Sequence, residues 1–231
     1  ALDNSIGIVG VAPKAKLYAI KVLNKNGSGT WSSVICGIDW VTANASKYGI
    51  KVANMSLGGG GTSDNNCGNS NSDALHQAIC RSISKGVTYV VASGNSSGNA
   101  ANSVPASYDD AVITVSALVD SDGKYGGIGP NTSYGADDTF ATFSNYGSVV
   151  DIGAPGVNIL STWKGGSYNT ISGTSMATPH VTGAAALYIG AHPGLIWTQV
   201  RDALIAAGEV LNSGHTDPSG LHPEPVLQVN F

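Results

Sequence analysis

The sequence predicts an α/β fold of three layers, in which helices flank a mostly parallel central sheet. The main observation is that short apolar runs alternate with helical patterns along the chain. A second is that two of these runs end in Gly-rich polar stretches, "MSLGGGG" and "ASGNSSG", as strands do where a site forms at the carboxyl edge of such a sheet. The length of 231 residues fits one large domain with a sizeable core.

The first half of the chain contains two expected strands and two expected helices. The apolar run "KLYAIKVL" at 16–23 predicts a buried strand, and 31–45 has the spacing of an amphipathic helix. Residues 51–58 predict a strand that ends in glycines. Residues 73–86 predict a helix with Asp73 as its N-cap and Gly86 at its end.

The second half continues the alternation. Residues 87–95, 111–118 and 149–155 predict three further strands, a long helix follows Ser175, and 196–208 form the last helix. Between two of these strands, "VDSDGKYGGIGPNTSYGADDTFA" at 119–141 is a long polar loop with the character of an insertion.

The composition excludes several classes of partner. Only 11% of residues are charged and the formal net charge is -4, without a basic patch for nucleic acid or a Lys/Arg cluster for a membrane surface. The apolar runs are too short to cross a bilayer. Low charge together with many Asn, Ser and 31 Gly residues favours a secreted protein, which we expect to be monomeric.

The three cysteines have different surroundings. Cys67 and Cys80 flank a loop that leads into a helix, and a disulfide there would contribute roughly 3 kcal/mol by closing a short loop. Two free thiols are the alternative. Cys36 lies in an amphipathic helical pattern, which predicts a buried free thiol. The His and Cys spacings do not indicate a zinc site.

Ser175 lies between small residues at the head of an Ala- and Gly-rich helix. There its Oγ would lie in the positive end of the helix dipole, beside unpaired N–H groups that stabilise a developing oxyanion. Small neighbours, Gly173 and Ala177, would let a substrate approach. A purely structural interpretation is also open, with Ser172 or Thr174 as a cap, or with Thr178–Pro179 at the helix start.

One enzymatic interpretation compares Gly173–Ala177 with the nucleophile elbow of α/β-hydrolases. Asp202 with His215 or His222 would keep the order of the triad in that fold. The elbow also requires a buried apolar strand before the serine, and "GGSYNTIS" is a poor one.

A second interpretation accounts for more of the chain. "GTSMATPHVTGAAAL" closely resembles the nucleophile motif of subtilisin-like serine proteases. "ALDNSIGIVGVAPKAKLYAIKVL", "NGSGTWSSVICGIDWV", "VANMSLGG", "VVASGN" and "DIGAPGVNILST" resemble further stretches of the same family in the same order. The resemblance covers nearly all of residues 1–231 except 119–141 and the last residues. It implies a subtilisin-like peptidase domain that hydrolyses peptide bonds through an acyl-enzyme.

The same resemblance implies the catalytic and substrate-binding residues. Ser175 matches the nucleophile, and Asn95 matches the side-chain oxyanion donor, although alone it would be interpreted as a turn residue. Two edge segments that would hold an extended peptide are Gly27, Ser28, Gly29 and Ser56, Leu57, Gly58. A wall of the primary specificity pocket, without charge and therefore suited to apolar side chains, is Ala92, Ser93, Gly94. The pocket for the fourth residue before the scissile bond would be Trp31, Val34 and Leu57, for which core packing is the alternative.

Calcium binding is implied in the same way. One arm of a strong Ca²⁺ site would use the carbonyls of Leu2, Ile6 and Ile8 with the side chain of Asn4, since oxygen ligands suit this ion. A weaker cation site would use the carbonyls of Ala106, Tyr108 and Ala111, after a Val104–Pro105 bond that we expect to be cis. Residues 120–123 with Asp137 and Asp138 would form a further Ca²⁺ site or a solvated acidic loop.

The family triad runs Asp, His, Ser, and the resemblance places its Asp and His before Ala1. No His precedes His76, and none of the five histidines resembles the base. His180 would point away from Ser175 because it lies five residues on along the same helix. We therefore expect an N-terminally incomplete domain that is essentially inactive alone, with polypeptide substrates and its own N-terminal segment or propeptide as partners. The alternative is an inactive pseudoprotease that binds peptides.

Overall fold

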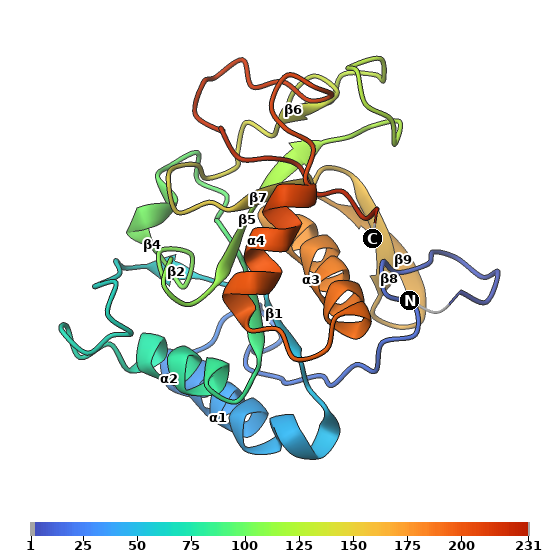
Figure 1. Ribbon diagram of the computed structural model, residues 1–231. Helices are drawn as coiled ribbons and strands as arrows, with labels where there is room; N and C mark the ends of the chain where they lie inside the picture. Colours follow the sequence, from blue (N-terminus) through green and yellow to red (C-terminus); the bar gives the residue numbers. More distant parts are fainter. Residues whose placement is uncertain (1–2, 231) are drawn as a thin grey trace.

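The computed structural model describes residues 3–230 and has helices on both faces of a mixed sheet (Figure 1). Four strands run parallel in the order β1 (Val52–Met55), β3 (Thr88–Ala92), β5 (Ile113–Val119) and β7 (Ile152–Pro155). The short β6 (Thr139–Phe140) pairs antiparallel with the end of β5. The expected α/β fold with a mostly parallel sheet is confirmed.

Two pairs of helices form the outer layers. α1 (Trp31–Tyr48) and α2 (Ala74–Ile83) enclose one hydrophobic core against the sheet, while α3 (Thr174–Ala191) and α4 (Trp197–Ala207) enclose a second. α3 lies across β1, β3, β5 and β7, so its N-terminus is positioned by most of the sheet. None of the helices in the described part of the chain is long and apolar enough to cross a membrane.

The helix starts follow local capping chemistry. The Asp73 side chain accepts hydrogen bonds from the N–H groups of Leu75 (3.0 Å) and His76 (3.2 Å), which confirms it as the N-cap of α2. α2 ends at Ile83, three residues before Gly86, whose φ of 82° marks the turn into β3. The helix is therefore slightly shorter than expected.

The prediction of a strand at residues 16–23 is wrong. These residues are not part of a strand, and Leu17 and Tyr18 are 86% and 43% exposed. A strand requires a neighbour that pairs with its backbone, and none of the described strands pairs with this segment. The apolar run is present, but its partner is absent from residues 3–230.

A hairpin before α3 was not expected from the sequence. β8 (Ile159–Trp163) and β9 (Ser167–Ile171) pair antiparallel around a turn in which Gly165 and Gly166 have φ of 77° and 74°. Its mostly exposed polar residues give no buried-strand signal. β9 ends shortly before Ser175, and it is not the buried strand that an α/β-hydrolase elbow would need.

A second small sheet borders the region around Ser175. β2 (Gly59–Gly60) pairs antiparallel with β4 (Ser103–Val104), which follows a short 3₁₀ helix, η1 (Ala100–Asn102). The expected cis Val104–Pro105 bond is confirmed.

The cysteines were predicted correctly in pairing but not in burial. Cys67 and Cys80 form the expected disulfide, with their Cα atoms 5.9 Å apart. Cys36 is a free thiol as expected, yet it is exposed on α1. The buried face of α1 includes Val34 and Ile38, and Cys36 lies two positions from each, which places it on the opposite, exposed face of the helix.

We predict that one thiol reacts when the protein is denatured without a reductant, and three react after reduction. The single thiol should be Cys36, because the other two sulfurs are bonded to each other. A thiol titration of the unfolded chain measures this directly. Cys36→Ser should bring the unreduced count to zero, and a count of three before reduction would contradict the disulfide.

Candidate active site

Ser175 is the second residue of α3, where the sheet positions the helix N-terminus. Its carbonyl accepts a hydrogen bond from Ser56 Oγ (2.9 Å), and its own Oγ lies 3.5 Å from the Ser56 carbonyl. Ser172 Oγ accepts from Asn158 and does not cap the helix, and Pro179 lies inside α3. α3 begins at Thr174 without a side-chain cap, so neither the caps nor the helix start at Thr178–Pro179 considered from the sequence is formed.

The side chain of Asn95 is oriented by the start of α3. Its Oδ1 accepts hydrogen bonds from both Thr174 N (2.8 Å) and Thr174 Oγ1 (3.0 Å). Because a backbone N–H can only donate, the oxygen of the amide must face Thr174. The Nδ2 group, which has no hydrogen bond among the described residues, is left to donate to a ligand next to Ser175.

Ser175 and Asn95 line one cavity of about 610 Å³ between the carboxyl end of β3 and the β2–β4 pair. No charged side chain lines it. Its lining includes seven residues expected from the sequence, namely Leu57, Gly58, Ala92, Ser93, Gly94, Asn95 and Ser175. A neutral cavity next to a serine and an amide donor can hold an uncharged side chain of a bound peptide.

The other residues expected to bind substrate do not line this cavity. Trp31 packs over β2 so closely that a Cβ on Gly59 would lie 2.9 Å from its ring. Val34 is only 4% exposed and belongs to the core under α1, with Leu57 packed against the same core. Gly27, Ser28 and Gly29 form an exposed turn before α1 and do not line the cavity.

Asn145 was not identified from the sequence, yet it shapes the loop that carries Asn95. Its buried Oδ1 accepts from Ser96 N (3.0 Å) and Gly98 N (3.1 Å), and its Nδ2 donates to the Ser93 carbonyl (2.9 Å). A Cβ on Gly94 would lie 2.4 Å from Nδ2, so the close fit requires glycine there. Asn145 is about 50 residues from this loop in sequence, which is why no local pattern revealed it.

None of the described histidines lines the cavity that holds Ser175. His180 Nδ1 lies 2.9 Å from the Met176 carbonyl and faces a different cavity, as expected from its helical position. His215 is buried against Glu209, and His222 against Glu224 (2.8 Å). Asp202 pairs with Arg201 at the surface (3.1 Å). The α/β-hydrolase arrangement is therefore wrong.

Comparison with known proteins agrees with this geometry. The model of the subtilase family, peptidase S8, matches residues 1–219.

The chain belongs to the subtilase family.

Relatives of this subtilase include subtilisin DY of Bacillus licheniformis and Subtilisin Savinase of Lederbergia lenta. Each is 42% identical, and the match covers 96% of this chain and 71% of theirs. A subtilase-type proteinase of the sexual differentiation process in Schizosaccharomyces pombe is 45% identical over 86% of this chain, which spans only 38% of that protein. The crystal structure of a cold-adapted subtilisin-like serine proteinase matches with a TM-score of 0.76 and 37% identity, over 96% of this chain and 72% of that one.

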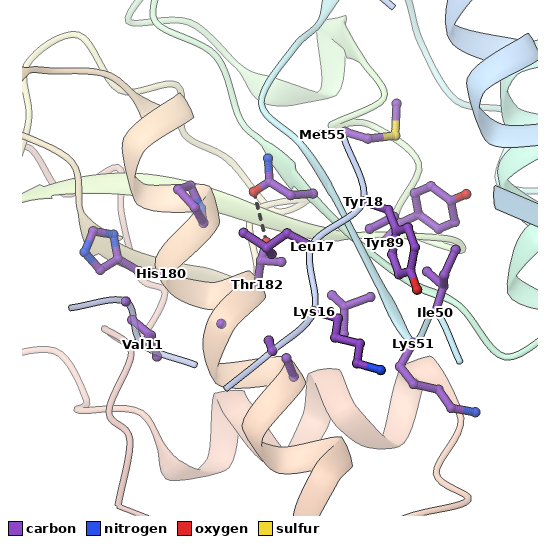
Figure 2. Close-up of a pocket in the computed structure, with 18 of the residues that line it drawn as sticks. Val11, Lys16, Leu17, Tyr18, Ile50, Lys51, Met55, Tyr89, His180 and Thr182 are labelled. Atoms are coloured by element: carbon purple, nitrogen blue, oxygen red, sulfur yellow. Dashed lines mark hydrogen bonds between the residues drawn. The ribbon is translucent and has the colours of Figure 1, made fainter. Parts of the chain in front are cut away.

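A second, larger cavity of about 1360 Å³ separates the irregular segment 16–22 from β1. Figure 2 shows Lys16, Leu17 and Tyr18 on one side of it, with Ile50 and Met55 on the other. β1 is the edge strand of the described sheet, so one row of its backbone groups is unpaired. The cavity therefore borders both an unpaired strand edge and an apolar segment that is not part of a strand.

Most of the residues expected to bind calcium lie in the described part of the chain, where several of their oxygens accept hydrogen bonds. Leu2 lies outside the described residues, and Asn4 Oδ1 accepts from Ile6 N (3.1 Å) in an exposed turn near Ile8. At the second site, the Ala106 carbonyl accepts from Thr114 Oγ1 (2.8 Å), while the Tyr108 carbonyl accepts from Ala111 N (2.8 Å). Calcium binding by these oxygens remains a prediction.

The acidic cluster of this subtilase is more buried than a solvated loop. Asp137 and Asp138 are 3% and 2% exposed, and with Asp120 their carboxylate oxygens lie within 4.8 Å of one another. Burial raises the pKa of Asp138, and the charge of Asp137 adds to this. Asp137 accepts two N–H groups, from Ser121 and Gly129, at 2.7 Å each.

We predict that Asn145→Ala loosens the loop of residues 93–98. It removes the partner of the Ser96 and Gly98 N–H groups and of the buried Ser93 carbonyl, and the loss at the buried carbonyl costs about 1–3 kcal/mol. Hydrogen exchange should become faster at the Ser96 and Gly98 amides, and the melting temperature should fall.

Asn44→Ala is the matched control, because Asn44 Nδ2 contacts only the Trp40 carbonyl on the exposed face of α1. It should leave both amides unchanged. Equal exchange in the Asn145→Ala variant and the parent protein would exclude a positioning role for Asn145.

Proposed function

We propose that this chain is the nucleophile-bearing part of a secreted serine endopeptidase that cleaves peptide bonds with a preference for apolar side chains. The observation that carries the proposal is the shared cavity of Ser175 and Asn95, in which Thr174 fixes the amide orientation. A nucleophile with a preorganised neutral donor beside it is the arrangement that acyl transfer requires.

The residues of the chain have separate roles in this reaction. Ser175 Oγ attacks the peptide carbonyl carbon, and the carbonyl oxygen gains negative charge. Asn95 Nδ2 and the Ser175 N–H donate hydrogen bonds to that oxygen, and the dipole of α3 adds to the stabilisation. Collapse of the intermediate expels the amine and leaves an acyl group on Oγ, which water then removes.

The preference for apolar or uncharged side chains follows from the lining of the cavity. Its walls contain glycines, Ala92, Val104 and neutral polar residues. A charged side chain that enters such a cavity loses water without gaining an ion-pair partner. The exposed backbone of the glycines at 58–60 supports binding of an extended peptide through main-chain hydrogen bonds.

Ser175 Oγ needs a base that residues 3–230 do not place beside it. A serine hydroxyl is a poor nucleophile until a neighbour removes its proton. We propose that a polypeptide segment outside residues 1–231 supplies a histidine and the aspartate that orients it. The groove between residues 16–22 and β1 supports this, because it offers an unpaired strand edge and an apolar lining.

A pseudoprotease that only binds peptides is the second candidate. It would keep the neutral cavity and the open glycine backbone. The fixed orientation of the Asn95 amide favours catalysis, because a peptide-binding groove has no need of a donor directed at a developing oxyanion. Calcium binding by Asn4, Ile6 and Ile8 also belongs to the proposal.

We predict that residues 1–231 alone hydrolyse peptide amides negligibly. In subtilisin, substrate binding and the oxyanion hole still accelerate hydrolysis by about 10³–10⁴-fold over the reaction in water when the triad is removed. Addition of a segment with the family's Asp strand and His helix, fused or as a separate polypeptide, should restore hydrolysis and raise the melting temperature.

Two variants separate the outcomes of this experiment. With the segment added, Ser175→Ala should abolish turnover but keep the rise in melting temperature, because it leaves the groove intact. If turnover by the chain alone is robust and is lost in His180→Ala, the base lies within this sequence and the proposal fails. A rise in melting temperature without any turnover would support the pseudoprotease.

We further predict that Asn95→Ala in the complemented enzyme lowers kcat with little change in KM. The amide donates to the oxyanion and not to the bound substrate. In subtilisin the loss of one such donor lowers kcat by a factor of about 10²–10³. Steady-state kinetics on a peptide amide measure the split.

Asn99→Ala is a matched control, because Asn99 lines the same cavity and its Oδ1 caps η1 rather than contacting Thr174. It should leave kcat within severalfold of the parent value. A large rise in KM with kcat unchanged for Asn95→Ala would show that Asn95 binds substrate and does not act on the transition state.

A further inference from the structure

A cluster of metal-ligating side chains lies away from the active site, between the start of α2 and the segment that precedes β5. It consists of Cys67, His76, Cys80 and Asp110, and one ligand atom from each lies within 4.8 Å of the others. Cys67 and Cys80 are bonded to each other in this structure. The spacing of these residues in the sequence does not match a zinc motif. Asp110 is distant from the other three in the chain, and the fold brings it next to them.

His76 is the member whose environment is unexplained. It is fully buried, and its Nε2 lies 2.8 Å from Asp110 Oδ1 while its Nδ1 lies 3.4 Å from Asp64 Oδ1. Neither nitrogen, nor Asp110 Oδ1, makes a hydrogen bond of acceptable geometry among the described residues. The two carboxylates are close enough to pair with the imidazole, but the poor hydrogen-bond geometry leaves these buried polar atoms available to another partner, such as a bound cation.

The surroundings hold the imidazole in place. The Tyr108 ring stacks on it at 4.0 Å between centroids, and Tyr108 Oη donates to Asp73 Oδ2 (2.5 Å). Asp64 is fixed in turn by the N–H groups of Asn66 (2.9 Å) and Gly68 (2.9 Å). A carboxylate behind one nitrogen of a histidine is the arrangement that directs the other nitrogen to a metal.

We propose that reduction of the Cys67–Cys80 disulfide creates a zinc site made of the two thiolates, His76 and Asp110. Two thiolates, one imidazole and one carboxylate are a tetrahedral ligand set that suits Zn²⁺. From usual bond lengths, the ligand atoms of such a site lie about 3.3–3.8 Å apart, so the present cluster needs only small movements once the sulfur–sulfur bond is broken. Asp64 orients His76 and does not bind the metal.

An external thiol can serve as the reductant of the Cys67–Cys80 disulfide. Two molecules of RSH transfer two electrons and two protons to the disulfide, leaving as RSSR and giving two cysteine thiols. Zn²⁺ then replaces the two thiol protons, which are released to solvent, while neutral His76 and ionised Asp110 complete the site. Both cysteines are half-buried, so a small reductant can reach them.

The zinc site would keep the loop of residues 61–72 attached to α2 when the disulfide is absent. The disulfide and the metal connect the same two positions, one in the loop and one on the helix. The disulfide and the proposed zinc site are therefore alternative crosslinks, and the redox conditions would decide which one forms.

The test is a titration of the 231-residue chain with Co²⁺ as a spectroscopic substitute for Zn²⁺, after reduction with a phosphine and again in the oxidised form. The reduced protein should bind one equivalent, with the intense visible bands of tetrahedral cobalt and a thiolate charge-transfer band that Zn²⁺ abolishes. The oxidised protein should show neither. This comparison needs no substitution, so the absence of both bands in the reduced protein overturns the proposal.

Variants identify the ligands. Cys67→Ser/Cys80→Ser should lose the charge-transfer band, and Asp110→Asn should weaken binding while its amide oxygen can still accept from Cys67 N. Asp64→Asn should lower the affinity about 10–100-fold. Cys36→Ser and His192→Ala are the matched controls and should not change binding. If Cys36→Ser removes the signal, or if Asp110→Asn leaves it unchanged, the assignment of the site is wrong.

Discussion

The contact between Asn95 and Thr174 is the interaction on which the candidate active site depends. It joins the loop after β3 to the first residue of α3, across 79 positions of sequence, through two hydrogen bonds to a single oxygen. Thr174 is fully buried, and its Oγ1 also accepts a hydrogen bond from Gly94 N (3.2 Å). One residue therefore sets the orientation of the amide, the path of the loop and the position of Ser175.

The rest of the fold supports this contact from both sides. α3 packs across four strands of the sheet, which fixes where its N-terminus lies. Asn145 holds the loop from the opposite side through its buried amide. By contrast, the region that faces the 16–22 segment is open, with an unpaired strand edge and exposed apolar side chains. Within residues 3–230, the loop that carries Asn95 is therefore held by hydrogen bonds to both Thr174 and Asn145, while no histidine lines the cavity of Ser175.

The sequence predicted correctly those features that depend on residues close together in the chain. The head of α3, the Asp73 cap and the Cys67–Cys80 pair were all predicted correctly, because helix starts and short loops are local features. The strand predicted from the apolar run at 16–23 is not formed, because a strand needs a neighbour to pair with and the described residues provide none for this segment. Asn145 could not be found in this way, since its hydrogen bonds join segments far apart in sequence.

The cysteine cluster and the active-site cavity are connected through one segment of chain. Gly61 N donates to the Asn102 carbonyl (3.1 Å) directly after β2, and Cys67 N donates to Asp110 Oδ2 (2.8 Å). The loop between them is therefore attached at both ends to residues 102–110, which also supply the β4 wall of the cavity. A crosslink from Cys67 to α2, whether a disulfide or a metal, anchors that wall to the helical layer. Because β2 and β4 pair over only two residues, this more distant attachment adds to the few contacts that hold the β4 wall of the cavity.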